Sequence, residues 1–442
     1  MTQGPILKQL VFFAMPLLLG NIFQLLYNMV DTIVVGNFVG KEALAAVGST
    51  NMMTNMVVFF FNGLSIGATV VIGNSFGAKD RDRLHRAIET TAVMTLGLCV
   101  FFTVFGVLFV VPMLKFMATP EDVMPDATVY LRTYMAGISG LMIYNMASGI
   151  LRAVGDTKRP LYFLILTSVV NIVLDLFFVI GLKLGVFGVA IATVIAQFIS
   201  AFLVILLLIK TKEIYRLTLN DLKADRDILK QVFRVGLPAA IQATLTSFSN
   251  AFVQAYVNYF GSSVMAGWSC YNKLDQFIFL PMSSMQHSAT TFVSQNMGAG
   301  DVKRANKGTF TAVAVAFGVV FTVGSLLVIF AEPANSIFTK DQEVIKYGAL
   351  FVRTNTFFLI ANSINHTLAG AIRGRGDSTG PMIIMLSTFV GLRQIYLFIM
   401  TRFIANTPVT VAFGYPVGWI SCGIIMLLYY NLKVKKREIK AG

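Results

Sequence analysis

Two acidic residues lie inside long apolar segments, where a charged side chain is costly to place. Asp31 lies in the segment near residues 9–37, and Asp175 lies in the segment near residues 160–181. A carboxylate in the hydrocarbon core of a bilayer costs roughly 2.5–3.5 kcal/mol on insertion scales. Charged residues that persist in such segments usually bind or move an ion or a substrate. We therefore treat the two aspartates as candidate functional residues.

Further polar residues share helical faces with these aspartates. Asn171 precedes Asp175 by four residues, so the two side chains lie one above the other on a helix. In the first segment, polar residues recur at spacings of three and four and form one stripe, which consists of Asn21, Gln24, Asn28 and Asp31. Such a stripe on an apolar helix faces protein or water rather than lipid. Pro16 removes a backbone hydrogen bond earlier in the same segment, which predicts a bend.

The depth of Asp31, Asp175 and Thr193 in the membrane predicts that their side chains lie close together. Counted at about 1.5 Å per residue from the outer ends of their segments, Asp31, Asp175 and Thr193 lie roughly 8–10 Å deep. Together with Asn171 they would form an oxygen-rich cluster that suits a hard cation such as Na⁺. Without a metal ion, one of two adjacent carboxylates would take a proton, so H⁺ is the alternative ligand. The remaining alternative is that these groups only hydrogen-bond neighbouring helices together.

The rest of the chain predicts membrane helices that position these residues. Of 442 residues, 56% are hydrophobic and 13% are charged, whereas a soluble globular protein carries about 25% charged residues. Continuous apolar runs favour membrane helices over the alternating strands of a barrel. Twelve such segments lie near residues 9–37, 45–74, 88–113, 125–150, 160–181, 186–209, 233–259, 264–295, 309–331, 344–371, 380–403 and 411–432. The expected fold is an all-α polytopic membrane protein with twelve transmembrane helices.

Basic residues predict the orientation of these helices. Lys and Arg concentrate in the loops on one side of the expected membrane and in the C-terminal tail. The positive-inside rule places these loops and both termini in the cytoplasm, and the expected location is the plasma (inner) membrane of a prokaryote. The net charge of +14 is explained by such loops, so no nucleic-acid partner is expected.

Composition and motifs exclude several function classes. The three histidines are scattered and the three cysteines lie far apart inside apolar segments, so neither a metal cluster nor a disulfide framework is expected. No Walker lysine pattern or GxGxxG follows a strand, so we expect no nucleotide cofactor. A lipid-modifying membrane enzyme would need a metal set or a carboxylate pair at the membrane surface, and the sequence offers neither. We expect a transporter and not an enzyme.

The two halves of the chain resemble each other. The stretch GILRAVGDTKRP at 149–160 returns as GAIRGRGDSTGP at 370–381, and Pro16 corresponds to Pro238. Six helices per half let both halves cross the membrane in the same direction, which predicts parallel repeats about a pseudo-two-fold axis normal to the membrane, as in some transporters. The predicted domains are an N-terminal lobe, a cytoplasmic linker with an amphipathic helix, a C-terminal lobe and a basic tail, at residues 1–209, 210–234, 235–432 and 433–442.

The second half does not repeat the acidic cluster. Its candidate cavity-lining residues are Gln254, Lys273, Asp275 and Arg393. Arg393 stands where the repeat would place Asn171, and Asp275 could pair with Lys273 or with Gln254. A structural ion pair and a substrate contact both stay open for these residues. Function is therefore expected to be asymmetric between the halves.

Taken together, these motifs resemble the multidrug and toxic compound extrusion (MATE) family. The resemblance rests on Pro16 and Asp31 in the first helix, the GxLRAxGDTxxP loop after the fourth, NxxxD in the fifth, and QNxGAG at 295–300. It covers nearly the whole chain. The family belongs to the same superfamily as the polysaccharide and lipid II flippases (the MOP superfamily), and the chain is most similar to the DinF-like branch.

The resemblance implies a function and a site. It implies a coupling-cation site at Asp31, Asn171, Asp175 and Thr193, with Gln24, Asn28 and Asn145 on the neighbouring polar wall and Pro16 as a hinge. Family members export amphipathic, often cationic, organic compounds against entry of Na⁺ or H⁺ by rocker-switch alternating access, and a monomer is expected. The alternative is a flippase or exporter of a lipid-linked or other anionic amphiphile. It would need intramembrane basic residues, for which only Lys273 and Arg393 are candidates.

Overall fold

The computed structural model describes residues 1–117, 119–219 and 222–434, apart from the side chains at 41, 42, 51 and 52. The first half contains α1 (Ile6–Phe38), α2 (Lys41–Gly77), α3 (Arg81–Phe116), α4 (Met124–Ala136), α5 (Ile138–Ala153), α6 (Lys158–Leu176) with the π-helix η1 (Phe177–Gly181), and α7 (Gly185–Lys210). In the described part of the chain, every regular element is a helix.

The second half follows the same plan with more interruptions. It contains α8 (Arg226–Asn258), α9 (Ser262–Gly298), α10 (Val302–Ile329), α11 (Ala331–Ser336), α12 (Gln342–Asn355), η2 (Thr356–Phe358), α13 (Leu359–Gly374), α14 (Thr379–Met385), η3 (Leu386–Leu392), α15 (Arg393–Ile399), η4 (Met400–Ile404), α16 (Pro408–Ala412), α17 (Gly414–Tyr429) and η5 (Tyr430–Val434). Continuous runs of these elements match the twelve predicted segments, so the expected all-helical membrane fold is confirmed. Within the described residues, nine helices are both long and apolar enough to cross a membrane.

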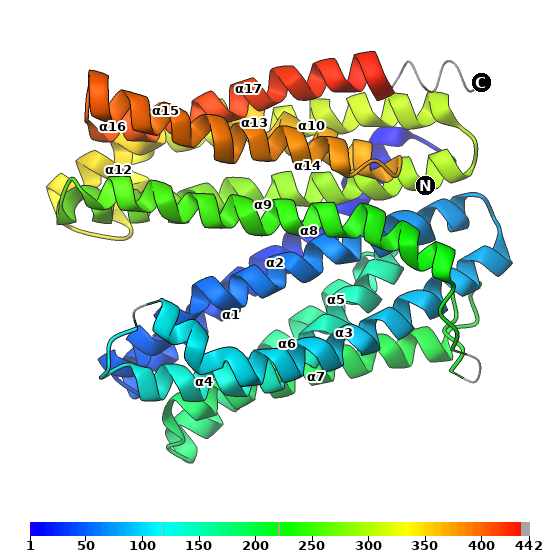
Figure 1. Cartoon of the computed structure of the whole chain (residues 1–442), viewed down its shortest axis with the longest axis horizontal. Helices are drawn as coiled ribbons and strands as arrows, with labels where there is room; N and C mark the ends of the chain where they lie inside the picture. Colours follow the sequence, from blue (N-terminus) through cyan, green and yellow to red (C-terminus); the bar gives the residue numbers. More distant parts are fainter. Residues whose placement is uncertain (118, 220–221, 435–442) are drawn as a thin grey trace. The chain divides into compact units, whose positions relative to one another are not determined.

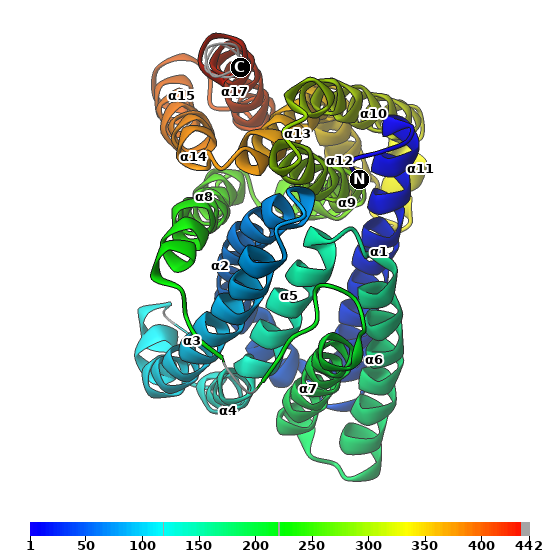
Figure 2. The same ribbon diagram turned by 90° about the vertical axis from the view of Figure 1, so that its right-hand side faces the viewer.

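One predicted segment, at 125–150, is divided in two. Gly137 lies between α4 and α5, where a Cβ atom would come within 2.3 Å of the Cγ1 atom of Val194 on α7. Both helices pack on α7, and Figure 2 shows α5, α6 and α7 side by side. The missing side chain therefore lets the α4–α5 junction lie against α7.

The chain separates into two compact units at positions that the sequence did not predict. One unit comprises Met15–Gly236, and the other comprises Met1–Ala14 together with Leu237–Gly442. We call them the N-unit and the C-unit. The predicted boundary gave the first residues to the N-terminal lobe and 210–234 to a separate linker. Instead, α1 begins in the C-unit and α8 begins in the N-unit.

The reason lies in the packing of the first turns of α1 and α8. Leu10 is fully buried in an apolar cluster with Phe292, and its carbonyl oxygen accepts a hydrogen bond from the Ser288 hydroxyl at 2.9 Å. Ile228 and Val232 are buried in a cluster of the N-unit. In each helix a proline follows two residues after the last residue of the exchanged segment, where the missing N–H weakens the helical ladder.

The linker does not form the separate amphipathic helix that the sequence predicted. Its described residues up to 225 are irregular, and the helix that follows is α8 itself. The Asp225 carboxylate accepts hydrogen bonds from the N–H groups of Asp227 and Ile228, which starts α8 there. Residues 220–221, at the predicted start of the helix, and 435–442 of the predicted tail lie outside the described residues.

In the C-unit, α9 is the central helix. It packs against α10, α12 and α13, and Figure 1 shows α9, α10 and α13 running alongside one another. One close approach is at Gly370 on α13, whose carbonyl oxygen accepts a hydrogen bond from the Thr290 hydroxyl on α9 at 3.0 Å. A Cβ atom at Gly370 would lie 2.5 Å from the carbonyl oxygen of Gln286.

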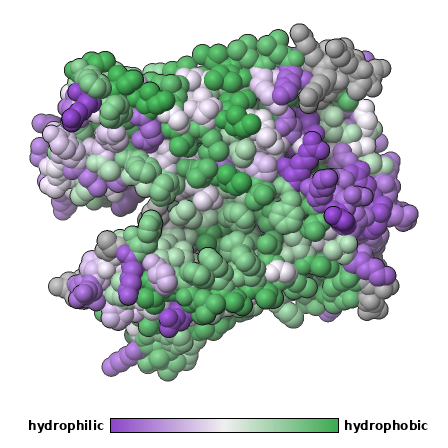
Figure 3. Space-filling view, in the orientation of Figure 1, coloured by the Kyte–Doolittle hydropathy of each residue, from purple (hydrophilic) through white to green (hydrophobic). Residues whose placement is uncertain are grey.

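The surfaces of both units fit a bilayer. Figure 3 shows apolar residues covering the sides of each unit, while hydrophilic residues gather at the ends of the helices. Large apolar side chains of α3 are exposed, among them Val100 at 67% and Leu108 at 68%. Such a surface would be unstable in water and is typical of lipid contact. The protein is a multi-pass membrane protein.

Candidate ion-coupling site

The two membrane aspartates come together in the N-unit. Asp175 on α6 is completely buried, Asp31 on α1 is half-buried, and their carboxyl groups face each other. Both carboxylate oxygens of Asp175 and the Oδ1 atom of Asp31 are buried without a hydrogen-bond partner among the described residues. The ion pairs of the described residues involve neither aspartate. Two acidic groups thus share a buried position with no basic partner.

Asn171 and Thr193 add neutral oxygens beside this pair. Asn171 lies one turn before Asp175 on α6, is 3% exposed, and has neither amide atom hydrogen-bonded within the described chain. Thr193 on α7 donates its hydroxyl to the carbonyl oxygen of Val189 at 3.1 Å, which leaves the lone pairs of its oxygen available. The structure thus pairs Asp31 with Asp175 and places Asn171 and Thr193 on the wall of one pocket, whereas a single site made of all four stays a prediction.

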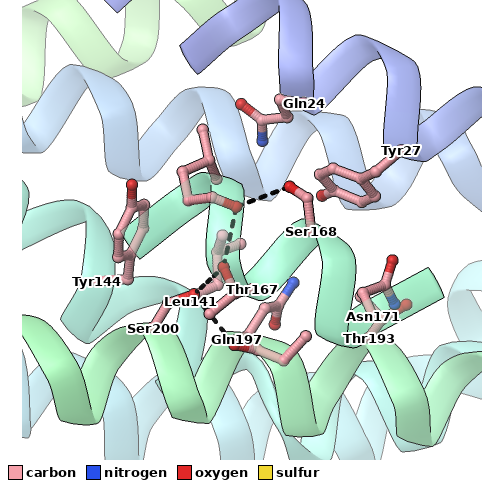
Figure 4. A pocket seen from close by; sticks show the side chains of 12 residues that line it. Gln24, Tyr27, Leu141, Tyr144, Thr167, Ser168, Asn171, Thr193, Gln197 and Ser200 are labelled. Carbon is pink, nitrogen blue, oxygen red and sulfur yellow. Dashed lines mark hydrogen bonds between the residues drawn. The ribbon is translucent and has the colours of Figure 1, made fainter. Parts of the chain in front are cut away.

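A pocket of the N-unit opens beside these residues, with about 440 Å³ of empty space counted out to its mouth. Figure 4 shows that Asn171 and Thr193 lie at one side of it and that Gln24 and Tyr27 of α1 lie above. At the other side, the Ser200 hydroxyl donates to the Thr167 hydroxyl at 2.8 Å. The wall combines apolar surface with hydroxyl and amide groups, as is typical of pockets for amphipathic ligands.

Several residues of this region were not predicted from the sequence. Tyr27 and Tyr130 lie close to Asp31, and the Tyr130 ring stacks on that of Tyr134 with centroids 6.4 Å apart. Gln197 lines the pocket from α7. Gln197 follows Thr193 by four residues, so its position on the same helical face could have indicated it. Tyr27 precedes Asp31 by four residues on α1, so the same spacing could have indicated it. Tyr130 carried no such signal, because packing of α4 against the other helices decides which face of α4 turns inward.

Some predicted residues lie outside the cluster. Asn28 is exposed, and Asn145 does not line the pocket but donates its amide to the carbonyl oxygen of Leu141 at 3.0 Å. Pro16 is buried in α1, two residues beyond the point where that helix passes from one unit to the other. The polar stripe on α1 is therefore only partly directed toward the pocket.

In the C-unit, neither of the two pairings left open for Asp275 is formed among the described residues. Lys273 lies with its Nζ atom 5.2 Å from the centroid of the Phe338 ring. Gln254 donates its amide to the Asn258 side chain at 2.7 Å, and Asp275 lies beside Tyr271. Side chains two positions apart on a helix point in different directions, which keeps Lys273 away from Asp275.

The N-unit cluster suits a small hard cation or a proton. In the described chain, no three His, Cys, Asp or Glu side chains gather as they would around a transition metal. Two carboxylates with an amide and a hydroxyl offer oxygen ligands, which alkali and alkaline-earth ions prefer. Two unpaired carboxylates in a low-dielectric interior repel each other unless a cation or a proton lies between them. The cluster can therefore exist in a loaded and an unloaded form.

Known proteins share this architecture. The sequence model described as MatE matches the chain twice, at residues 16–177 and 238–399. The "Probable multidrug resistance protein YoeA" of Bacillus subtilis (strain 168) is 28% identical over 446 residues, covering 98% of this chain and 95% of that relative. An "FAD transporter" of Shewanella oneidensis is 24% identical over 358 residues, covering 79% and 78%.

The fold has close counterparts among solved structures. One is the outward-facing conformation of a multidrug resistance MATE family transporter of the MOP superfamily, with a TM-score of 0.92, 23% identity and coverage of 98% of this chain and 97% of that one. The two MatE matches begin at Pro16 and Pro238, in agreement with the internal repeat. Since these matches span most of the sequence, the chain belongs to the MATE family of membrane transporters.

Proposed function

We propose that this protein is a cation-coupled antiporter that exports amphipathic organic compounds across the plasma (inner) membrane, with both termini in the cytoplasm and the monomer as the working unit. The observation that carries the proposal is that half-buried Asp31 and buried Asp175 face each other with no basic partner among the described residues. Such a pair binds a cation strongly in one environment and releases it in another. A secondary transporter needs that difference in affinity.

The proposed cycle uses the pair as a switch. In the outward-facing state, Na⁺ or H⁺ enters at Asp31 and Asp175 and removes their mutual repulsion. Loading favours release of the exported compound and return to the inward-facing state, where the cation leaves. The ion shifts the equilibrium only by the difference between its affinities for the two states. Pro16 and Pro238 are the expected hinges, because α1 and α8 each pass from one unit to the other just before them.

The test uses purified protein in vesicles with an imposed gradient. Asp31→Asn and Asp175→Asn, made separately, should abolish export of ethidium, a cationic dye, under both a Na⁺ gradient and a pH gradient. Asp82→Asn, at an exposed site in the first turn of α3, is the control and should export as the wild type does. If both aspartate variants retained gradient-driven export, the proposed coupling role of Asp31 and Asp175 would be contradicted.

A binding measurement separates the two candidate ions. If Na⁺ binds the cluster, Na⁺ at about 100 times its Kd should stabilise the wild type by about 2.7 kcal/mol. Asp175→Asn should show no such response. If H⁺ is the coupling ion, Na⁺ should leave the melting temperature of both proteins unchanged while a pH gradient alone drives export.

A second candidate function is export of an anionic amphiphile. One relative is named an FAD transporter, and the C-unit of this chain contains the buried Arg393. A guanidinium in that position attracts a carboxylate or phosphate rather than a cationic drug. The coupling mechanism stays the same, and only the charge of the exported compound differs.

A further inference from the structure

We propose that Arg393 forms an anion-binding site in the C-unit, which receives a carboxylate or phosphate group of the exported compound. The inference rests on the proposed transport function and specifies its substrate class. It also assigns opposite tasks to equivalent positions of the two repeats. The N-unit position binds the coupling cation, and the C-unit position binds the anionic group of the substrate.

The internal repeat places Arg393 at the position of the cation cluster. The offset of 222 residues that relates Pro16 to Pro238 also relates Asn171 to Arg393. It relates Thr193 to Tyr415 and Asp175 to Leu397 as well. Where the N-unit carries a carboxylate, an amide and a hydroxyl, the C-unit therefore carries a guanidinium, a tyrosine and an apolar side chain.

Arg393 is buried, and its charge lacks a close counter-ion. The residue is 2% exposed. Its Nη2 atom donates to the Ser249 hydroxyl at 2.7 Å, and its guanidinium lies 4.7 Å from the centroid of the Tyr415 ring. The Nε atom is buried without a partner among the described residues, and none of their ion pairs includes this arginine. A buried charge without a counter-ion destabilises the protein, and a bound anion would offset that cost.

The backbone around Arg393 is arranged to hold the guanidinium still. The π-helix η3 ends at Leu392, directly before the arginine, and π-helical turns occur frequently at functional sites. The Ser249 hydroxyl donates to the carbonyl oxygen of Phe389 at 3.3 Å. It accepts from Arg393 and from the Gln394 amide, the latter at 3.2 Å. Because this hydroxyl is saturated, it fixes one edge of the guanidinium and leaves the other donors free.

Tyr415 covers the Arg393 guanidinium and lies where a ligand would approach it. Its ring is half-buried, and its hydroxyl donates to the Asn250 side chain at 3.5 Å. Asn250 is exposed, so this hydrogen bond links Tyr415 to the surface of the C-unit. A rotation of the Tyr415 side chain would open the guanidinium to a ligand while its ring stays available for stacking. A flat ring bearing a carboxylate or phosphate fits this pairing of tyrosine with arginine.

Asp275 is an acidic residue near this cluster. Its carboxylate lies beside the Tyr271 hydroxyl and is close to Tyr415, but it forms no ion pair with Arg393. If Asp275 were the counter-ion of Arg393, a ligand anion would have to compete with it. The effect of removing Asp275 therefore distinguishes an anion site from an internal pair.

The experiment compares two ligands that differ in one anionic group. Flavin mononucleotide and riboflavin share the same ring system, and only the first carries a phosphate. The chain contains two tryptophans, Trp268 and Trp419, and their rings lie 5.7 Å and 5.4 Å from that of Tyr415. Flavin bound near Tyr415 should quench their fluorescence. Binding can thus be titrated on the purified full chain.

The wild type should bind flavin mononucleotide at least about tenfold more tightly than riboflavin, the size expected of a charge-assisted contact. Arg393→Gln should bring the ratio to about one and leave riboflavin binding unchanged. Asp275→Asn should leave the preference unchanged, since Asp275 forms no ion pair with Arg393. Equal affinities in the wild type, or an unchanged preference in Arg393→Gln, would overturn the proposal. So would a much stronger preference in Asp275→Asn, because Asp275 would then be the internal counter-ion of Arg393.

Two further measurements check this interpretation. If Arg393→Gln fails to fold, Arg393→Lys keeps the charge and should keep a preference of at least about threefold, and its complete loss in a folded protein would refute the site. Nanodiscs with and without phosphatidylglycerol distinguish a soluble anion from a lipid headgroup. Competition by that lipid would identify the headgroup as the source of the phosphate.

The test is independent of the coupling mechanism. Asp31→Asn should lose gradient-driven export but keep the preference for flavin mononucleotide, since the aspartate lies in the other unit. A wild type that prefers flavin mononucleotide but shows no ion-driven export would contradict the proposed antiport alone. A wild type that exports ethidium under a gradient but binds both flavins equally would contradict the anion site alone.

Discussion

Replacing Gly67 with alanine tests how the first turns of α8 are held in the N-unit. A Cβ atom at Gly67 on α2 would lie 2.2 Å from the carbonyl oxygen of Val232 and 2.7 Å from the backbone nitrogen of Gly236. Both neighbours are backbone atoms of α8, so neither can rotate away. The added methyl group requires the two helices to move apart, and Ile228 and Val232 lose part of their burial in the process.

The magnitude follows from this geometry. Overpacking of a tight contact costs about 1–3 kcal/mol when the helices can shift. The N-unit has roughly 220 residues, and a domain of that size loses about 2–4 °C in melting temperature per kcal/mol. Gly67→Ala should therefore lower the melting temperature by roughly 2–12 °C. It should also speed proteolysis in the irregular stretch before α8, because that stretch is anchored by the same helix.

The assay is thermal unfolding in detergent, with Gly48→Ala as the matched control. Gly48 lies in the same helix, and a Cβ atom there would meet no atom within 4 Å. Alanine is a better helix former than glycine, so the control should be neutral or stabilising by up to about 1 kcal/mol. Equal melting temperatures for Gly67→Ala and Gly48→Ala would refute the close contact between α2 and α8.

Three further substitutions test contacts near the ends of the helices. Asp377→Ala should cost about 1 kcal/mol in thermal unfolding, because its carboxylate caps the turn at the start of α14 at 3.0 Å, and an unchanged melting temperature would contradict that role. The hydrogen bond from the N–H of Ile228 is the main cause that holds the pKa of Asp225 below its usual range. Asp225→Asn should therefore be less stable than the wild type above about pH 4. This difference in stability should vanish as the pH falls through the folded-state pKa of Asp225. Arg304→Met should expose the N-terminal segment to protease, because the Arg304 guanidinium donates to the carbonyl oxygen of Gly4 at 2.7 Å. Lys303→Met, at an exposed position, is the control, and equal cleavage of both variants would refute the role of Arg304 in holding this segment.

Much of the fold could be predicted because bilayer thickness restricts helix length. Each apolar run had to be about 20 residues long, so the twelve segments and their order were readable from the sequence. The repeat was readable as well, from GILRAVGDTKRP and GAIRGRGDSTGP. The approach of Asp31 to Asp175 followed from counting depth along their two helices, because the rise per residue is constant.

The depth of a residue in the membrane does not determine which way its helix is rotated. The features of the site that were not predicted depend on that rotation. Tyr130 turns toward Asp31, and Lys273 lies over the Phe338 ring, only because neighbouring helices pack as they do. The same holds for the exchange of the first turns of α1 and α8 between the units, which rests on contacts of Leu10 and Val232 far away in the sequence.

The acidic site and the basic site illustrate the division between sequence and tertiary structure. The sequence alone predicted that Asp31 and Asp175 lie at the same depth in the membrane. Placing a carboxylate in an apolar segment costs free energy, and its depth can be counted in residues from the end of the segment, so both are local properties of the sequence. It left open whether Arg393 has a structural partner. Only the packed C-unit shows this arginine buried against Ser249 and Tyr415, with no carboxylate of the described chain in ion-pair contact, because the absence of a counter-ion depends on every helix around it.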